Sequence, residues 1–268
     1  MKTKVAVIGL GFVGGSVYES FKRREPFLDL VGIDPAKGFN TPLSEIKDFD
    51  GVFVCVPSPQ LANGACDTST LENVLADLER NEFNGVIISK VTAPAGVYQR
   101  LQAEYPNLVH APEFLTAANA YEDYINGEFA IVGGEVSAYR YEAERLMRIS
   151  QTKLANVMHC TIGEASLAKY AINSFLATKV VFMNEMAKLT EKSNCDWETV
   201  SDLVRMDKRI GNSHTMVPGP DGAYGFGGHC FPKDTNALLR YAESIGVDMS
   251  VLDAAVKKNL IIRLTEPK

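Results

Sequence analysis

One short segment combines several residue types that could do covalent chemistry. It runs Gly225-Phe-Gly-Gly-His-Cys-Phe-Pro-Lys-Asp-Thr235 and places Cys230 behind paired glycines and four residues before an aspartate. Gly227 and Gly228 remove side chains where a substrate could approach the backbone, and Pro232 stiffens the exit. The segment predicts an active-site loop in which Cys230 is a nucleophile. The alternative is that Cys230 is a small buried hydrophobe in a glycine-rich turn.

A lysine and an asparagine lie four residues apart in an apolar stretch. The segment from Glu164 to Lys192 predicts one long helix, apolar on nearly every face, that is mostly buried. Lys169 and Asn173 share one face of this helix, one turn apart. An ammonium among apolar neighbours must extend to water or meet a partner, because an unpaired buried charge is costly. Both interpretations of Lys169 stay open at this point.

The first residues have the pattern of a dinucleotide-binding turn. An apolar strand from Val5 is followed by Gly9-Leu-Gly11-Phe-Val-Gly14 and then by a helical segment. Gly9 permits a tight turn, Gly11 lets the backbone approach a pyrophosphate, and Gly14 lets helix and strand pack. Asp34 ends a second strand and can accept hydrogen bonds from adenosine ribose hydroxyls, which favours NAD over NADP. Without a ligand, the same pattern would be an ordinary strand-to-helix turn.

Alternating strands and helices predict an α/β fold. Further strands are expected at residues 51–56, 85–89, 108–109 and 129–132, with helices at 72–79 and 97–104. This order predicts a Rossmann-type doubly wound parallel sheet. Ser58 and Thr92 follow two of the strands, so their hydroxyls are expected to point toward a cofactor crevice at the carboxyl ends. Such residues also often merely cap strands and helices.

The second half of the chain is expected to be all-helical. After the long helix, shorter helices are predicted at residues 197–206, 236–245 and 250–264. We therefore expect an NAD-binding Rossmann domain at residues 1–158 and a helical central, catalytic domain at 159–268.

Composition excludes several classes of protein. The 268 residues are 22% charged and 46% apolar, which is ordinary for a globular protein. The net charge of −6 and the lack of a polybasic arm argue against nucleic-acid binding. No signal peptide or apolar run of membrane-spanning length is visible. The five cysteines lack metal-ligand spacing, so no metal site and a reducing, cytoplasmic setting are expected.

Several motifs, taken together, resemble the UDP-glucose/GDP-mannose dehydrogenase family. The Cys230 segment is similar to that family's glycine-glycine-x-cysteine-phenylalanine-proline-lysine-aspartate signature, and its Phe231-to-Thr235 part looks most like the UDP-glucose branch. Matching segments occur in the same order over nearly the whole chain. They are Gly9 to Gly14, Lys90-Val-Thr-Ala-Pro94, Pro112-Glu-Phe-Leu115, Glu164-Ala to Lys169-Tyr-Ala-Ile-Asn173, Asn184-Glu185 and Arg209-Ile-Gly211.

The resemblance implies a four-electron oxidation. The family oxidises a sugar C6 alcohol to a carboxylate with two NAD molecules, here UDP-glucose to UDP-glucuronate. Cys230 would hold the aldehyde-level intermediate as a thiohemiacetal and then as a thioester, which water cleaves. Lys169 and Asn173 would stabilise the oxyanions of these steps from a rigid helix.

The resemblance also assigns the remaining site residues. Thr92 and Asp234 would position water or accept protons, and Glu113 would be a general acid or base rather than a simple helix-start acid. The expected substrate contacts are Phe114, Leu115, Lys169, Asn173, Gly227 and Arg209. Arg209 would reach the sugar or phosphates of its own or a neighbouring subunit, or it could instead be a solvated surface arginine. The expected cofactor contacts are Gly9, Gly11, Phe12, Val13, Gly14, Asp34, Ser58, Thr92 and Lys233.

The chain departs from the family pattern in three places. The second glutamate expected after Pro112-Glu-Phe-Leu115 is replaced by Thr116-Ala117-Ala118. The loop between Arg209 and Cys230 is longer, and His229 replaces a small residue. The family's C-terminal nucleotide-binding domain is absent, so the chain is either a minimal enzyme or a fragment, and weak substrate binding is expected.

Two other functions remain open on the sequence. A β-hydroxyacid dehydrogenase shares the two-domain plan and a helical lysine and asparagine, but does not need Cys230. A catalytically silent NAD-binding module would need none of the catalytic residues. A UDP-N-acetylhexosamine or GDP-mannose substrate is also open, and the apolar central helix and the end of the final helix predict a homodimer.

Overall fold

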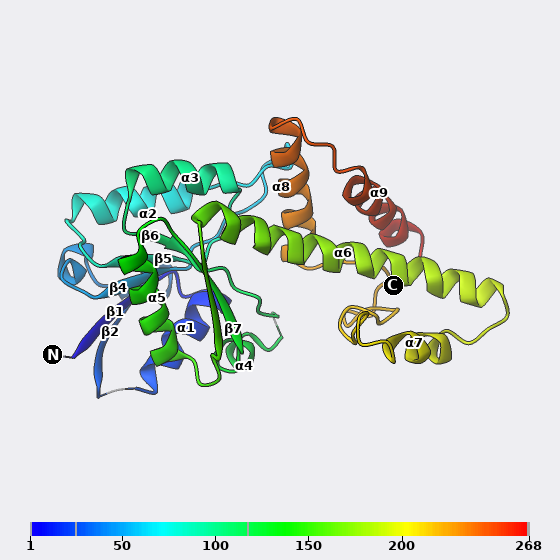
Figure 1. Cartoon of the computed structure of the whole chain (residues 1–268), viewed down its shortest axis with the longest axis horizontal. Coiled ribbons are helices and arrows are strands. Elements are labelled where there is room, and N and C mark those ends of the chain that lie inside the picture. Colours follow the sequence, from blue (N-terminus) through cyan, green and yellow to red (C-terminus); the bar gives the residue numbers. More distant parts are fainter. Residues whose placement is uncertain (1, 25, 117, 267–268) are drawn as a thin grey trace. The chain divides into compact units, whose positions relative to one another are not determined.

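The computed structural model describes residues 2–24, 26–116 and 118–266. Contacts divide the chain into two compact units. Unit 1 consists of Met1–Pro59 and Cys66–Lys169, and unit 2 consists of Gln60–Ala65 and Tyr170–Lys268. Figure 1 shows the elements of each unit coloured along the sequence.

A mostly parallel eight-stranded sheet is the centre of unit 1, which confirms the predicted Rossmann-type fold. The strand order is β3-β2-β1-β4-β5-β6-β7-β8. The strands are β1 (Thr3–Ile8), β2 (Leu28–Asp34), β3 (Phe39–Asn40), β4 (Gly51–Val54), β5 (Val86–Ser89), β6 (Leu108–His110), β7 (Phe129–Gly133) and β8 (Asn156–Cys160).

The sheet is not parallel throughout, which corrects the sequence-based prediction. The β2–β3 and β6–β7 pairs are antiparallel. β3 follows β2 after only the short 3₁₀ turn Pro35–Lys37, which is too short for the crossover that a parallel neighbour requires. The chain therefore turns back at this edge.

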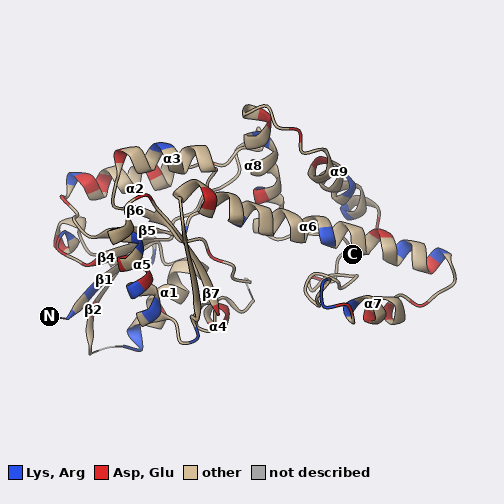
Figure 2. Cartoon of the chain, in the orientation of Figure 1, with Lys and Arg blue, Asp and Glu red and all other residues tan. Residues whose placement is uncertain are grey.

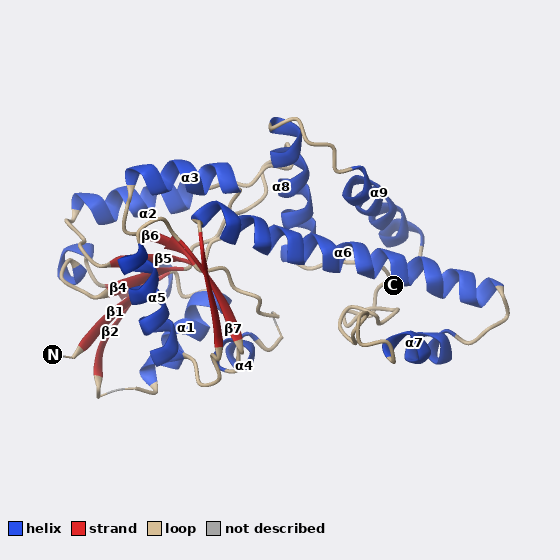
Figure 3. Cartoon of the chain, viewed as in Figure 1, coloured by secondary structure: helices blue, strands red, loops and turns tan. Residues whose placement is uncertain are grey.

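Helices cover both faces of the sheet (Figure 3). On one face, α1 (Phe12–Lys22), α4 (Ala120–Ile125) and α5 (Ser137–Ser150) pack on residues such as Val5 and Val7. On the other face, α2 (Ser69–Arg80) and α3 (Ala95–Glu104) pack on residues such as Ala6 and Ile8. Successive strand residues thus contribute to opposite cores, as the two-residue period of a strand requires. The sheet is buried on both sides.

Among the strands and α-helices of unit 1 that the structure describes, β3, α4, α5 and β8 were not predicted. The last two lie near the predicted domain boundary at 158/159, which falls inside β8. β8 is an edge strand, and its partly exposed pattern, with Met158 68% exposed, gives a weak strand signal. The contacts divide the chain later, within α6, and the domain assignment itself stays a prediction.

Unit 2 is helical. The long helix α6 (Ile162–Lys192) begins in unit 1 and continues into unit 2, followed by α7 (Trp197–Arg205), α8 (Cys230–Ser244) and α9 (Ser250–Thr265). The small core of unit 2 contains Ala177 and Val181 from α6, Phe226, and Ala255 and Ile262 from α9. Within the described ranges, no helix is long and apolar enough to cross a membrane.

Most positions of α6 are buried or partly buried, as predicted, but one face of the helix exposes apolar side chains. Phe175, Phe182 and Leu189 are 70%, 56% and 58% exposed. They are seven residues apart, which is about two helical turns, so they form one apolar stripe along α6. The apolar residues that the sequence places on nearly every face of α6 are therefore not all buried, and one apolar face of the helix is exposed in the single chain.

The predicted active-site loop is partly helix. α8 begins at Cys230, whereas the sequence analysis placed the start of this helix at residue 236. Pro232 lies in the first turn, where a missing N–H costs no intrahelical hydrogen bond. The prediction that Pro232 ends a loop is therefore corrected: it belongs to the helix start.

Candidate active site

In the glycine-rich turn after β1, Gly9 and Gly14 leave no room for a side chain, whereas the space beside Gly11 is open. A Cβ on Gly9, which has φ +83°, would lie 2.9 Å from the Cys55 carbonyl oxygen, and a Cβ on Gly14 would lie 1.8 Å from the Gly9 oxygen. Beside Gly11, the N-cap residue of α1, no described atom lies within 4 Å of such a Cβ. The turn can therefore present the open N-terminus of α1, with Phe12 and Val13, to a ligand.

Asp34 fastens the same turn. Its Oδ2 accepts a hydrogen bond of 2.9 Å from the Leu10 N–H, while Oδ1 accepts none from the described residues. The Lys37 ammonium donates to the Leu10 carbonyl. One carboxylate oxygen of Asp34 thus has a structural role, and the other has no hydrogen-bond donor among the described residues.

Ser58 and Thr92 are linked to each other beyond the ends of β4 and β5. The Ser58 hydroxyl donates to the Thr92 carbonyl at 2.9 Å, and the Cys66 thiol donates to the same oxygen at 3.3 Å. The Ser58 hydroxyl therefore has a partner in the protein. The Thr92 hydroxyl makes no hydrogen bond with the described residues and is the better candidate for a ligand contact.

Lys169 is buried and paired with Glu113. Their side chains are 4% and 8% exposed, and Lys169 Nζ lies 3.3 Å from Glu113 Oε1. Nζ also donates to the Glu113 carbonyl, and Glu113 Oε2 accepts from the Leu115 N–H at 2.7 Å. The Phe114 ring lies 5.1 Å from Nζ. Lys169 therefore does not extend to water, and Glu113 does not start a helix.

A cavity of about 450 Å³ lies beside this pair, lined in part by Lys90, Glu113, Tyr124 and Gln151. Lys90 is 5% exposed, and its ammonium makes no hydrogen bond or ion pair with any described residue. Burial lowers the pKa of Lys90 to about 8, although Cys55 and Glu113 act in the opposite direction. Gln151 Oε1 is also buried and has no hydrogen-bond partner in the part of the chain that the structure describes. This cavity could not be predicted from local sequence patterns, because its lining residues come from four separate segments.

In unit 2, Asp234 joins two residues that the sequence analysis proposed for different tasks. Asp234 is 1% exposed. Its Oδ2 accepts from Asn173 Nδ2 at 2.6 Å, and its Oδ1 lies 2.7 Å from Lys233 Nζ. Lys233 and Asp234 lie in the first turns of α8, which begins at Cys230, and Asn173 of α6 contacts them there through Asp234. Lys233, expected at the cofactor, is bonded to Asp234.

The glycine segment before Cys230 is fixed by amide side chains. Asn184 Oδ1 of α6 accepts from the Gly225 N–H at 2.9 Å. Asn259 of α9 bonds both groups of Phe226, accepting from its N–H at 2.7 Å and donating to its carbonyl at 3.0 Å. A Cβ on Gly227 would lie 2.1 Å from Nη2 at the flexible end of Arg263, so a larger residue here would displace that side chain. Sequence reasoning assigned Asn184 and Asn259 no role, although buried asparagines in apolar helices were a usable signal.

Arg209 lies in the turn after α7, with its side chain 89% exposed. It pairs with Asp207 at 2.6 Å. At the position of the family's second glutamate, Ala117 lies outside the described residues, and the neighbouring Thr116 donates to Asp123.

The structure thus groups the predicted residues within each unit. In unit 1 they form the Gly9–Gly14 turn with Asp34, the Ser58–Thr92 link, and the Glu113–Lys169 pair with Phe114 and Leu115. In unit 2 they form the Asn173–Asp234–Lys233 network at the start of α8. Figure 2 shows acidic and basic residues interspersed along the helices. Within the described ranges, no cluster of three or more His, Cys, Asp or Glu could hold a metal ion.

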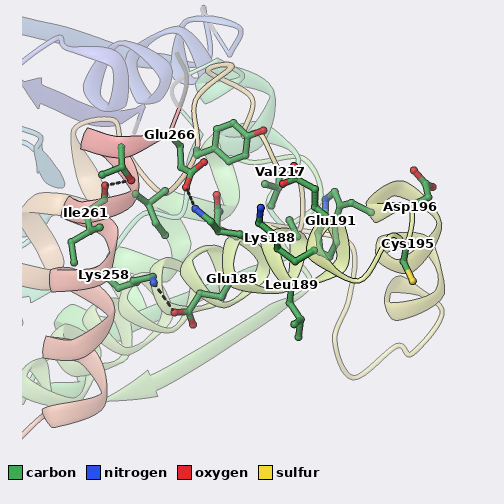
Figure 4. A pocket seen from close by; sticks show the side chains of 17 residues that line it. Glu185, Lys188, Leu189, Glu191, Cys195, Asp196, Val217, Lys258, Ile261 and Glu266 are labelled. Atoms are coloured by element: carbon green, nitrogen blue, oxygen red, sulfur yellow. Dashed lines mark hydrogen bonds and ion pairs between the residues drawn. The ribbon is translucent and has the colours of Figure 1, made fainter.

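A second cavity, of about 560 Å³, lies between α6 and α9 in unit 2 (Figure 4). Lys258 pairs with Glu185 at 3.3 Å and Lys188 with Glu266 at 2.5 Å along its walls. None of the predicted site residues lines it. We therefore do not take it as the candidate active site.

Comparison with protein families gives two matches. Residues 36–152 match the NAD binding domain of the UDP-glucose/GDP-mannose dehydrogenase family, and residues 163–260 match the central domain of that family.

Individual proteins agree with these matches. The chain is 31% identical to UDP-glucose 6-dehydrogenase TuaD of Bacillus subtilis over 96% of its own length, and it spans 62% of that protein. A UDP-glucose dehydrogenase structure from Pyrobaculum islandicum matches with a TM-score of 0.81 and 25% identity, over 97% of this chain and 68% of that one. A 3-hydroxyisobutyrate dehydrogenase from Mycobacterium tuberculosis shares the fold, with a TM-score of 0.77 and 17% identity, over 96% of this chain and 92% of that one.

Proposed function

Because the chain belongs to the UDP-glucose/GDP-mannose dehydrogenase family, we propose that it oxidises the C6 alcohol of UDP-glucose to the carboxylate with NAD. One observation carries the proposal: Cys230 begins α8, and Asp234 in the next turn is buried between Lys233 and Asn173. A β-hydroxyacid dehydrogenase has no use for a cysteine at this place. The positive end of a helix favours a thiolate in its first turn.

The proposed chemistry has three steps. The C6 alcohol loses a hydride to NAD⁺ and a proton to a base, which leaves an aldehyde. The Cys230 thiolate adds to the aldehyde carbon, and the oxygen takes up a proton to give a thiohemiacetal. The thiohemiacetal then loses a second hydride to a second NAD⁺ and its hydroxyl proton to a base, forming a thioester. Water then cleaves the thioester, which releases the carboxylate and regenerates the thiol.

The buried polar groups have distinct tasks in this proposal. The Lys169 ammonium and the Asn173 amide, one turn apart on α6, stabilise developing oxyanions from a rigid element. Glu113, fixed by Lys169 and the Leu115 N–H, exchanges protons in the acyl steps. Asp234 orients Asn173, and Thr92 contributes its unbonded hydroxyl.

The cofactor is proposed to bind at the Gly9–Gly14 turn. The open space beside Gly11 and the remaining oxygen of Asp34 support this place for the pyrophosphate and the ribose. A carboxylate there would repel a 2′-phosphate, so NAD is favoured over NADP. A cytoplasmic location is part of the same proposal.

A homodimer is proposed on the apolar stripe of α6. The exposed side chains of Phe175, Phe182 and Leu189 share the uncovered face of this helix, and Leu260 and Leu264 near the end of α9 are also exposed. Apolar surface of this extent is typical of a protein–protein interface.

The first experiment measures NADH formed per UDP-glucose consumed, with the 268-residue chain and excess NAD. Two NADH per sugar are expected. Cys230→Ala should abolish the second oxidation, while Cys195→Ala, which alters an exposed thiol in another segment, should not. One NADH per substrate that is insensitive to Cys230→Ala would favour the β-hydroxyacid type of reaction. NAD binding without turnover on any nucleotide sugar would favour a silent module.

A further inference from the structure

A single side chain of α6 holds the turn that follows α7. The Lys179 ammonium donates to the carbonyls of Ile210 at 2.8 Å, Gly211 at 3.4 Å and Ser213 at 2.6 Å. Lys179 forms no ion pair with any described residue, and burial lowers its pKa. Its charge is therefore met by backbone carbonyls alone.

The backbone bends to place these carbonyls around the ammonium. Gly211 has φ +69° and His214 has φ +61°, and the latter conformation is costly for a residue with a side chain. Three carbonyl dipoles that converge on one point repel each other unless a cation lies there. Removal of the ammonium should therefore release the turn rather than leave it unchanged.

The turn at residues 210–214 is next to two parts of the proposed site. Arg209, expected to reach the sugar or phosphates, immediately precedes the anchored carbonyls. On the other side, the His214 ring lies 5.4 Å from the ring of Phe231, which follows Cys230 in α8. The segment that Lys179 holds is thus preceded in sequence by a proposed substrate-binding residue and followed by His214, which contacts the helix that carries the proposed nucleophile.

Two further hydrogen bonds, both made by Thr215, hold the C-terminal end of the turn. Arg205 Nε donates to Thr215 Oγ1 at 2.8 Å, and Thr215 Oγ1 donates to the Asn212 carbonyl at 2.9 Å. Because Thr215 is buried, this end should stay in place when Lys179 is changed. The effect of a Lys179 variant should therefore be confined to residues 209–214.

We propose that Lys179 is a positioning residue for nucleotide-sugar binding: it fixes the 210–213 backbone so that Arg209 is presented to the substrate. The proposal rests on the proposed function and adds a residue to it. Lys179 touches neither substrate nor cofactor in this scheme.

The test compares Lys179→Met with Lys192→Met, which removes the same charge from the exposed end of α6, and with Lys179→Arg, which keeps a cation. Lys179→Met should lower kcat/KM for UDP-glucose by about 10- to 100-fold, mainly through KM, because a misplacement of about 1 Å can cost about 100-fold. Lys179→Arg should retain part of the activity and Lys192→Met nearly all of it. In an Arg209→Ala background, Lys179→Met should cost less than about 2-fold, since both changes remove the same interaction.

Two further measurements separate this proposal from the proposed function. Backbone hydrogen exchange should rise at residues 210–214 in Lys179→Met and not in Lys192→Met; unchanged exchange would refute the anchor whatever the activity. If the wild-type chain shows no turnover, the proposed function fails, and calorimetric binding of UDP-glucose replaces KM. Equal binding by wild type and Lys179→Met would then overturn the positioning role.

Discussion

Replacing Lys90 by methionine should make the protein more stable. The Lys90 ammonium is buried beside the cavity of unit 1 and makes no hydrogen bond or ion pair with any described residue; its nearest aromatic ring is Tyr124, at 5.9 Å. Methionine has nearly the same length and carries no charge. The change therefore removes an uncompensated charge without opening a large hole.

The expected gain follows from the proton affinity of Lys90. Burial lowers its pKa from the ordinary 10.5 to about 8 in the folded chain. Below pH 8 the amine is charged in both the folded and the unfolded chain, and burial of that charge costs about 3 kcal/mol at 1.36 kcal/mol per pH unit. Between pH 8 and 10.5 the unfolded chain binds more protons than the folded chain, so stability rises with pH and the penalty disappears.

The assay is urea unfolding of wild type, Lys90→Met and the control Lys153→Met, which alters an exposed lysine after α5. At about pH 7, Lys90→Met should exceed wild type by up to about 3 kcal/mol, and the difference should vanish near pH 10.5. Burial also raises the pKa of the Cys55 thiol from 9.0 to about 12. The contribution of Cys55 to the stability of the folded protein is therefore lost as pH rises above 9. Comparison of the two proteins at each pH removes most of this opposing effect.

A Lys90→Met protein that is no more stable than wild type at pH 7 would refute the reasoning. It would mean that water or a ligand in the cavity compensates the charge. A more stable variant that also loses turnover would show that the site retains Lys90 at a cost in stability.

Three other changes test separate parts of the structure. Gly14→Ala should abolish NAD binding in calorimetry, because its Cβ would lie 1.8 Å from a loop carbonyl, while Gly15→Ala, with 3.5 Å to the nearest atom, should bind normally. Asp234→Asn should lower the free energy of unfolding in urea by about 3 kcal/mol, because it leaves a lysine without its buried carboxylate; a loss below about 0.5 kcal/mol would contradict this. Phe182→Glu should produce monomers in light scattering, whereas Phe27→Glu, in unit 1 and 80% exposed, should not.

Local patterns predicted most of the fold. The strands β4 and β5 are short, fully buried and mostly apolar runs, and their ends agree with prediction to within two residues. The start of α8 was missed, because Gly227, Gly228 and Pro232 favour a loop unless tertiary contacts hold the segment. Those contacts come from α6 and α9, which are distant in sequence.

The residue types of the site were also predictable, but their partners were not. Lys169 was expected either to meet a partner or to extend to water, and only the fold brings it to Glu113, 56 residues away. The same holds for Asn173 and Asp234, which are 61 residues apart. Lys90 was missed for the opposite reason: its lack of partners is visible only when the surrounding side chains are in place.

The double hydrogen bond between Asn259 and Phe226 has a practical consequence for protein engineering. Asn259 pairs with both polar groups of one residue, as a neighbouring strand would, and Arg263 Nε adds a bond to the same carbonyl at 3.0 Å. The final helix therefore works as a template for the glycine segment that leads to Cys230. A chimera that joins this chain to a foreign C-terminal domain must place its junction beyond Arg263, because an earlier junction would exchange the template together with the domain.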